Sequence, residues 1–163
     1  MKKYIVIAML GFTTVSYAQK MNIETDTHAK AYATDSIMIN APVEEVYSRL
    51  ADINHWPGWF QGVTEAKVNG PVKEGAVFVW KAKGYKIESK LHTIRPNSAI
   101  GWTGKVWWIN AVHNWRFIPV ANRQTKVVIQ ESFSGLGSSF MKNSMKEDMR
   151  NDLIGLKNVS EKN

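Results

Sequence analysis

The sequence contains no cysteine. Disulfide bonds, thiolate zinc sites, iron–sulfur clusters, cysteine nucleophiles and lipid attachment through an N-terminal cysteine are therefore excluded. The four histidines are scattered along the chain, and none stands at metal-ligand spacing from a second ligand. A serine-centred nucleophile elbow is absent as well. We therefore expect neither a metal nor an organic cofactor.

Long apolar runs are also lacking, apart from one at the N-terminus. There, Lys2 and Lys3 precede an apolar stretch over residues 4–12, and small residues follow up to Ala18. This layout is typical of a secretory signal peptide cut after Ala18, and the run is too short for a comfortable membrane span. We expect residues 1–18 to be removed and the mature protein to be exported to the periplasm or the medium. The alternative is a buried N-terminal strand.

The charge balance is basic without being extreme. The formal net charge is +7 over 163 residues, and loss of Lys2 and Lys3 lowers it by two to +5. Such a balance favours anionic surfaces in general and does not establish nucleic-acid binding. The length, with 44% hydrophobic and 21% charged residues, indicates one globular domain with an ordinary core.

Most of the chain reads as strands bounded by turns. Residues 19–34 are polar and lack periodicity, so we expect a lead-in before a first strand at residues 35–40. Apolar residues then recur at helical spacing over residues 43–50, and a short helix or turn broken by proline and glycine follows. From residue 63 to residue 133 the pattern alternates with a period of two. Glycine or proline breaks it about every dozen residues, as in an antiparallel meander.

The period changes again near the C-terminus. A long helix from residue 138 to about residue 159 is predicted by one apolar stripe at helical spacing: Met141, Met145, Met149, Leu153 and Leu156. Strands segregated from a long helix predict an α+β fold, with the helix across one face of an antiparallel sheet. A curved sheet that grips a helix leaves a cleft between them, which is a common place for apolar ligands.

Several segments resemble a known superfamily. They are "INAPVEEVYSRLADINHWPGWFQGV", "GAVFVWKAKG", "IGWTGK", "HNWRF", "TKVVIQESFSG" and the closing amphipathic helix. Together they are similar to the SRPBCC superfamily of START-like and birch-pollen-allergen-like proteins, and most of all to its polyketide cyclase/dehydrase-like branch. The resemblance covers residues 35–161 as a single domain. It implies a helix-grip fold of about seven strands (β-α-α-β6-α) around the C-terminal helix, with a hydrophobic cavity between.

The superfamily includes lipid carriers, hormone receptors and cyclases, so the resemblance transfers no catalytic residue. We instead take the pocket from the inward faces of the strands, the turn after the first helix and the methionine stripe. The candidate pocket residues are Trp59, Phe78, Trp80, Ile87, Ser89, Leu91, Trp102, His113, Trp115, Glu131, Phe133, Met141, Met145 and Met149.

His113 and Glu131 are the candidate catalytic pair. His113 shares a face with Trp115, and Glu131 shares one with Phe133. If both faces line the cavity, the carboxylate can hold the imidazole tautomer and raise its basicity, as general acid–base chemistry requires. Two other interpretations stay open: a buried, satisfied pair that fixes strand register, and a polar group that orients a ligand.

Two other patterns point away from nucleotides and nucleic acids. "GLGSSF" at residues 135–140 begins like a dinucleotide fingerprint, but Phe140 replaces the third glycine and no parallel strand follows. Its two glycines instead permit a sharp strand-to-helix turn. The basic residues of the third and fourth strands face away from the aromatic residues, which indicates a solvated outer face or docking to anionic lipid: Lys81, Lys83, Lys86 and Lys90.

Three functions stay open on the sequence alone. The first is an exported binding protein, without enzymatic activity, for a lipid, isoprenoid or polyketide-like molecule. The second is a polyketide-cyclase-like lyase or isomerase that uses His113 and Glu131. The third is an interaction module that uses the tryptophan-rich edge, which export disfavours. We expect a small apolar or amphipathic ligand, no nucleic acid and no transmembrane segment in the mature chain. The charge is compatible with transient contact with an anionic membrane.

Overall fold

The computed structural model describes residues 20–162, so the predicted signal peptide lies outside the described residues. Along the chain the elements are β1 (Ala31–Ile39), α1 (Val43–Ala51), η1 (Ile53–Gly58), β2 (Val63–Val68), β3 (Val77–Ala82), β4 (Tyr85–Arg95), β5 (Ala99–Val106), β6 (Ile109–Val120), β7 (Gln124–Ser134), η2 (Ser138–Met141) and α2 (Lys142–Ser160).

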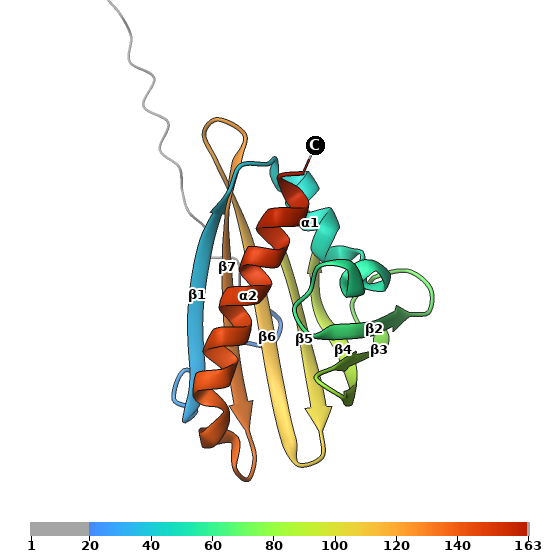
Figure 1. Ribbon diagram of the computed structural model, residues 1–163, viewed down its shortest axis with the longest axis vertical. Helices are drawn as coiled ribbons and strands as arrows, with labels where there is room; N and C mark the ends of the chain where they lie inside the picture. Colours follow the sequence, from blue (N-terminus) through green and yellow to red (C-terminus); the bar gives the residue numbers. More distant parts are fainter. Residues whose placement is uncertain (1–19, 163) are drawn as a thin grey trace, which may run out of the picture.

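A single antiparallel sheet of seven strands carries the fold, in the order β1-β7-β6-β5-β4-β3-β2. Strands β2 to β7 form a meander, and β1 pairs with the last strand, β7. The sheet curves around α2, while α1 packs at the end where β6 and β7 are joined and η1 follows it toward β2 (Figure 1). The α+β helix-grip fold expected from the sequence is confirmed.

Large aromatic residues fill the core between the sheet and the helices at one end of the grip. Trp56 of η1 is fully buried, and its ring contacts Phe60, Phe78, Trp80 and Trp102 with ring centroids 4.9–5.7 Å apart. The indole Nε1 of Trp56 donates a hydrogen bond of 2.9 Å to the Leu50 carbonyl, which satisfies its polar atom. The α2 side of this core is aliphatic, with Met145, Met149, Leu153 and Leu156 buried.

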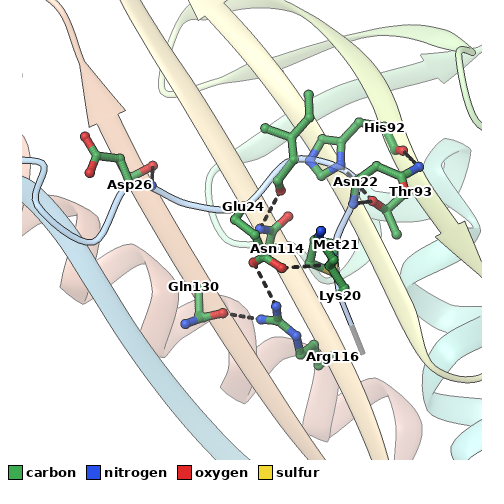
Figure 2. A network of polar contacts seen from close by, with 12 residues as sticks. Lys20, Met21, Asn22, Glu24, Asp26, His92, Thr93, Asn114, Arg116 and Gln130 are labelled. Atoms are coloured by element: carbon green, nitrogen blue, oxygen red, sulfur yellow. Dashed lines mark hydrogen bonds and ion pairs between the residues drawn. The ribbon is translucent and has the colours of Figure 1, made fainter. Parts of the chain in front are cut away.

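The N-terminal part of the described chain differs from the sequence-based expectation. β1 begins at Ala31, inside the predicted lead-in, because residues 31–39 pair in register with β7. Residues 20–28 lie across the outer face of the sheet, opposite α2, and we call this segment the strap (Figure 2). Irregular hydrogen bonds hold it, such as those from the Asn22 amide to Thr93 Oγ1 at 2.8 Å and from Asn114 Nδ2 to the Ile23 carbonyl at 2.9 Å.

Met21 anchors the strap. Its side chain is fully buried and enters a hollow above Gly101 of β5. A Cβ atom at position 101 would lie 2.8 Å from Met21 Cε and 2.4 Å from His92 Cε1, so only glycine leaves room for both side chains. Ion pairing adds to this anchor, because Arg116 Nη2 lies 3.0 Å from Glu24 Oε2.

Candidate functional site

A cavity of about 570 Å³ lies between the sheet and the first turns of α2. Strands β3 to β7, the turn between β5 and β6, and the segment from Leu136 to Asp148 line it. Its volume falls in the range of small-molecule sites, about 300–1,000 Å³. The cavity reaches the surface where exposed residues of the two loops, such as Trp107 and Leu136, line it.

The cavity exists because inward-facing side chains become smaller along the strands. Toward α1, β5 and β6 present Trp102 and Trp115 to the core. Toward the other end the same faces carry Gly104 and Ala111, which are cross-strand partners, and β3 ends on Ala82. Gly104 and Ala82 leave the volume that Trp102 and Trp80 fill two residues earlier on the same strands. The large side chains therefore fill the cleft beyond the inner end of the cavity, and the small ones leave its space.

His113 lies at the floor, paired with Glu131. The two residues face each other directly across β6 and β7, and Nδ1 of the imidazole donates a hydrogen bond of 2.7 Å to Oε1 of the carboxylate. Both side chains are buried, and His113 lines the cavity whereas Glu131 does not. Within residues 20–162, Nε2 of His113 has no hydrogen-bond partner, so it is the ring nitrogen left for a ligand.

Aromatic rings fix the orientation of this imidazole. The ring of His113 stacks on Trp102, with centroids 5.1 Å apart and an interplanar angle of 18°. Phe133 and Trp80 contact it edge-on at 6.1 Å and 6.5 Å. The indole Nε1 of Trp80 donates to Ser89 Oγ at 3.0 Å, which fixes that ring in turn. His113 is therefore held by one stacked ring, two edge-on aromatic contacts and one hydrogen bond.

Two α2 carboxyl groups, those of Asp152 and Asp148, lie in or beside the inner region of the cavity. Burial raises the pKa of Asp152 well above its ordinary value, and the charges of Glu131 and Asp148 raise it further, against a lowering backbone hydrogen bond from Gln61. Asp148 lines the cavity, and its Oδ1 lies 2.5 Å from Nζ of Lys83. The inner region thus holds a carboxyl group that favours its protonated form, beside a hydrogen-bonded His–Glu pair.

The structure places six of the predicted pocket residues on the cavity wall: Trp80, Ile87, His113, Phe133, Met141 and Met145. The other eight do not line it: Trp59, Phe78, Ser89, Leu91, Trp102, Trp115, Glu131 and Met149. Most of these have the predicted inward orientation but lie deeper, in or beside the aromatic core. Alternation identifies the inward face of a strand, whereas the depth along the strand depends on which part of the cleft other side chains fill.

Other lining residues were not predicted. The Lys83–Asp148 pair and the loop residues Trp107, Trp108 and Leu136 all line the cavity. A sequence signal for the cavity was present in the small residues at inward positions near the turns. None of the described residues forms a group of three or more His, Asp or Glu side chains able to hold a metal ion.

A curved seven-stranded antiparallel sheet that encloses a cavity against a C-terminal helix defines the helix-grip class of ligand-binding and cyclase proteins. The chain belongs to the family described as polyketide cyclase / dehydrase and lipid transport, which matches residues 30–161. The SRPBCC/START-like resemblance expected from the sequence is thereby confirmed. A comparison with curated protein sequences found no match.

Solved structures with the same fold come from several bacteria. A hypothetical protein from Helicobacter pylori is 17% identical with a TM-score of 0.74, over 82% of this chain and 90% of that one. The ZhuI aromatase/cyclase from a Streptomyces species is 14% identical with a TM-score of 0.70, over 80% and 93%. A START superfamily protein from Mycobacterium smegmatis is 10% identical with a TM-score of 0.69, over 80% and 97%. At these identities the likeness establishes the fold alone.

Proposed function

We propose that the protein binds one small apolar or amphipathic molecule, such as a lipid, isoprenoid or polyketide-like compound, inside the cavity. The observation that carries this proposal is that one cavity combines apolar walls with a single polar group at its floor. Its walls are largely apolar, and its floor presents a single oriented imidazole, that of His113. Sites for such ligands are mostly apolar and use a few placed polar groups to fix orientation.

The wall combines rigid and adaptable side chains. Trp80, Ile87 and Phe133 come from strands, whereas Met141 and Met145 come from η2 and α2. Methionine has an unbranched, polarisable side chain that fits irregular shapes. A ligand therefore has its flexible apolar part against the methionines and its hydrogen-bonding group at Nε2 of His113. The Lys83–Asp148 pair nearer the surface offers a second polar contact.

We also propose that the protein is exported. The support is the N-terminal pattern, in which Lys2 and Lys3 precede an apolar run and a small-residue stretch that ends at Ala18. No helix within residues 20–162 is both long and apolar enough to cross a membrane. Expression of the full sequence in a bacterial host, cell fractionation and intact-mass analysis test this proposal. A periplasmic protein whose mass corresponds to a chain that begins at Gln19 supports export. A cytoplasmic protein with the mass of the full-length chain contradicts it.

Native mass spectrometry of protein purified from its own host tests ligand binding. A bound species of lipid-like mass that is lost on denaturation supports the proposal. Titration with palmitate and with an isoprenoid alcohol follows, on the wild type and on His113→Ala. Loss of the polar contact is expected to weaken binding about tenfold, equivalent to about 1.4 kcal/mol. An apo mass that does not shift with any of these compounds would contradict the carrier function.

A second candidate function is acid–base catalysis on an enolisable polyketone. The observation that favours it is the His113–Glu131 hydrogen bond, because a carboxylate that holds Nδ1 leaves Nε2 as a base toward the cavity. In this reaction Nε2 takes a proton from the carbon between two carbonyl groups, and the resulting enolate then isomerises or cyclises.

Proton exchange tests this reaction without knowledge of the natural substrate. A β-diketone in deuterated water is followed by NMR with and without the protein. Catalysis predicts faster exchange of the acidic protons with the wild type, and loss of most of the acceleration with His113→Ala. If the wild type and His113→Ala give the same exchange rate, His113 does not catalyse proton transfer, and binding is the only supported function.

A further inference from the structure

The mouth of the cavity is surrounded by apolar side chains that no other part of the described chain covers. Phe140 is 92% exposed, Leu136 82%, Trp107 65% and Trp108 58%. With Tyr85 and Met141, which are also exposed, we call them the mouth patch. They come from the β3–β4 hairpin, the β5–β6 turn and the segment after β7. The β5–β6 turn and this last segment lie at the end of the molecule opposite α1 (Figure 1).

Specific contacts hold much of this patch in place. Nε1 of Trp108 donates a hydrogen bond of 2.8 Å to the Leu136 carbonyl, which ties the β5–β6 turn to the segment after β7. A Cβ atom at Gly135 would lie 2.1 Å from the Trp108 carbonyl oxygen, so glycine is needed for this close approach. The rings of Trp107 and Trp108 stack with centroids 5.6 Å apart, and Tyr85 meets Trp107 edge-on at 5.3 Å. The aromatic side chains are therefore presented outward in a defined arrangement.

Lysine residues flank the mouth patch. Lys86 follows Tyr85, Lys105 lines the cavity just before the β5–β6 turn, and Lys142 and Lys146 lie on the first turns of α2. All four are exposed, and none forms an ion pair within residues 20–162. The carboxylates in this region are Glu88, which is opposite Lys105, Glu147 and Asp148, and the last is already paired with Lys83. The region is therefore positively charged.

We propose that the mouth patch docks the protein onto an anionic phospholipid bilayer, with the cavity mouth against the lipid. Tryptophan and tyrosine rings partition to the membrane interface, and protruding Phe140 and Leu136 side chains insert among the acyl chains. Lysines beside them are attracted to anionic headgroups, each by about 1 kcal/mol. A ligand then passes between bilayer and cavity without crossing water. This last step rests on the proposed binding function, whereas the docking surface itself does not.

Vesicle flotation tests the docking. The protein from Gln19 to Asn163 is mixed with phosphatidylcholine vesicles that contain no phosphatidylglycerol or about 30 mol% of it. Flotation is expected with the anionic vesicles and should weaken in high salt. The double variant Leu136→Ser/Phe140→Ser should bind at least about tenfold more weakly, because both side chains lose their insertion into lipid. The variant Lys142→Glu/Lys146→Glu should float less with the anionic vesicles than the wild type does, because it loses the attraction to their headgroups. As the matched control, Ile118→Ser/Val120→Ser removes exposed apolar side chains at the opposite end and should bind as the wild type does.

Tryptophan fluorescence gives an independent readout, because Trp107 and Trp108 are far more exposed than the buried tryptophans of the core. Their emission should shift to the blue on anionic vesicles and become shielded from acrylamide. Failure of the wild type to float, or equal flotation of Leu136→Ser/Phe140→Ser, would overturn the proposal. A third outcome would also overturn the proposal. If the wild type does not bind vesicles but forms a concentration-dependent dimer, and Leu136→Ser/Phe140→Ser does not form this dimer, the patch joins two copies of the protein. Ligand titration of the same proteins without vesicles tests the binding function separately, so failure of docking can be distinguished from failure of ligand binding.

Discussion

His113 of β6 and Glu131 of β7 are direct cross-strand partners, with Nδ1 and Oε1 2.7 Å apart in a buried position. The pairing is compatible with two of the interpretations that the sequence leaves open, because the pair joins β6 to β7 in register and His113 also lines the cavity. Its consequences for stability are separable from those for binding.

Glu131→Ala should lower the free energy of unfolding by about 2 kcal/mol, because it leaves the buried Nδ1–H of His113 without an acceptor. Glu131→Gln retains an acceptor oxygen and should recover about half of this loss. Urea denaturation at pH 7 measures both. Glu147→Ala, at an exposed glutamate of α2, is the control and should change stability by less than about 0.5 kcal/mol. Equal stability of the wild type and Glu131→Ala would mean that the pair contributes nothing to the fold.

Ala111→Phe should block the cavity without unfolding the protein. Ala111 lines the cavity and faces Gly104 and Phe133 on the neighbouring strands, so a phenyl ring enters existing space. Binding of an apolar fluorescent probe should fall at least about tenfold, while the free energy of unfolding changes by less than about 1 kcal/mol. The control is Val112→Phe, which places the same ring on the outer face of the sheet. Undiminished probe binding in Ala111→Phe would indicate that the probe binds elsewhere.

Asp152 makes stability depend on pH above its ordinary pKa. Burial and the charges of Glu131 and Asp148 raise the pKa of Asp152 well above 3.8 in the folded protein, so the native state binds this proton more tightly than the unfolded chain. Stability is therefore lost as pH rises through 3.8 toward the raised value, by about 1.4 kcal/mol for each unit of difference. Asp152→Asn removes the ionisation and should be more stable than the wild type at pH 7 but not at pH 3. A constant difference between the two proteins across this range would contradict the raised pKa.

His92 should make the free energy of unfolding fall as the pH is lowered in mild acid, which is the opposite direction to the effect of Asp152. Burial beneath the strap, with a smaller contribution from His113, lowers its pKa from 6.5 to about 4 (Figure 2). The folded state holds the neutral ring, so stability is fully present above pH 6.5 and is lost as pH falls toward 4. Because the ring is partly accessible to water, we expect a loss of about 1–2 kcal/mol.

The measurement for His92 is urea denaturation of the wild type and His92→Gln at pH 7 and pH 4.5. His92→Gln should reduce the difference between the two conditions, and His28→Gln, in an exposed part of the strap, should leave it unchanged. Proteolysis near the strap should also increase in acid for the wild type. An unchanged acid response of His92→Gln would assign the response to other groups.

Regular periodicity made the fold predictable from the sequence. Alternation predicted that His113 and Glu131 face inward on neighbouring strands, and the helical stripe predicted the buried face of Met145, Met149 and Leu153. The strap was not predicted, because side-chain-to-backbone hydrogen bonds hold it and these leave no period in the sequence. The extent of the cavity was also missed. It depends on where Trp102 gives way to Gly104 on the same strand, and on which side chains from η1 fill the space above.

The aromatic side chains at the floor of the cavity set an upper limit on the length of a molecule that can bind there. In the proposed binding mode, a molecule that enters at Trp107 meets His113 and Trp80 at a fixed depth, and the ring of Trp102 is stacked on His113 outside the cavity. Those rings are held by their neighbours, so a longer chain gains no space by pushing further. If the proposed ligand binds in this way, a polar group at its inner end can contact His113, and the depth of the cavity limits the length of the rest. Homologues with a smaller residue in place of Trp102 would accept longer molecules.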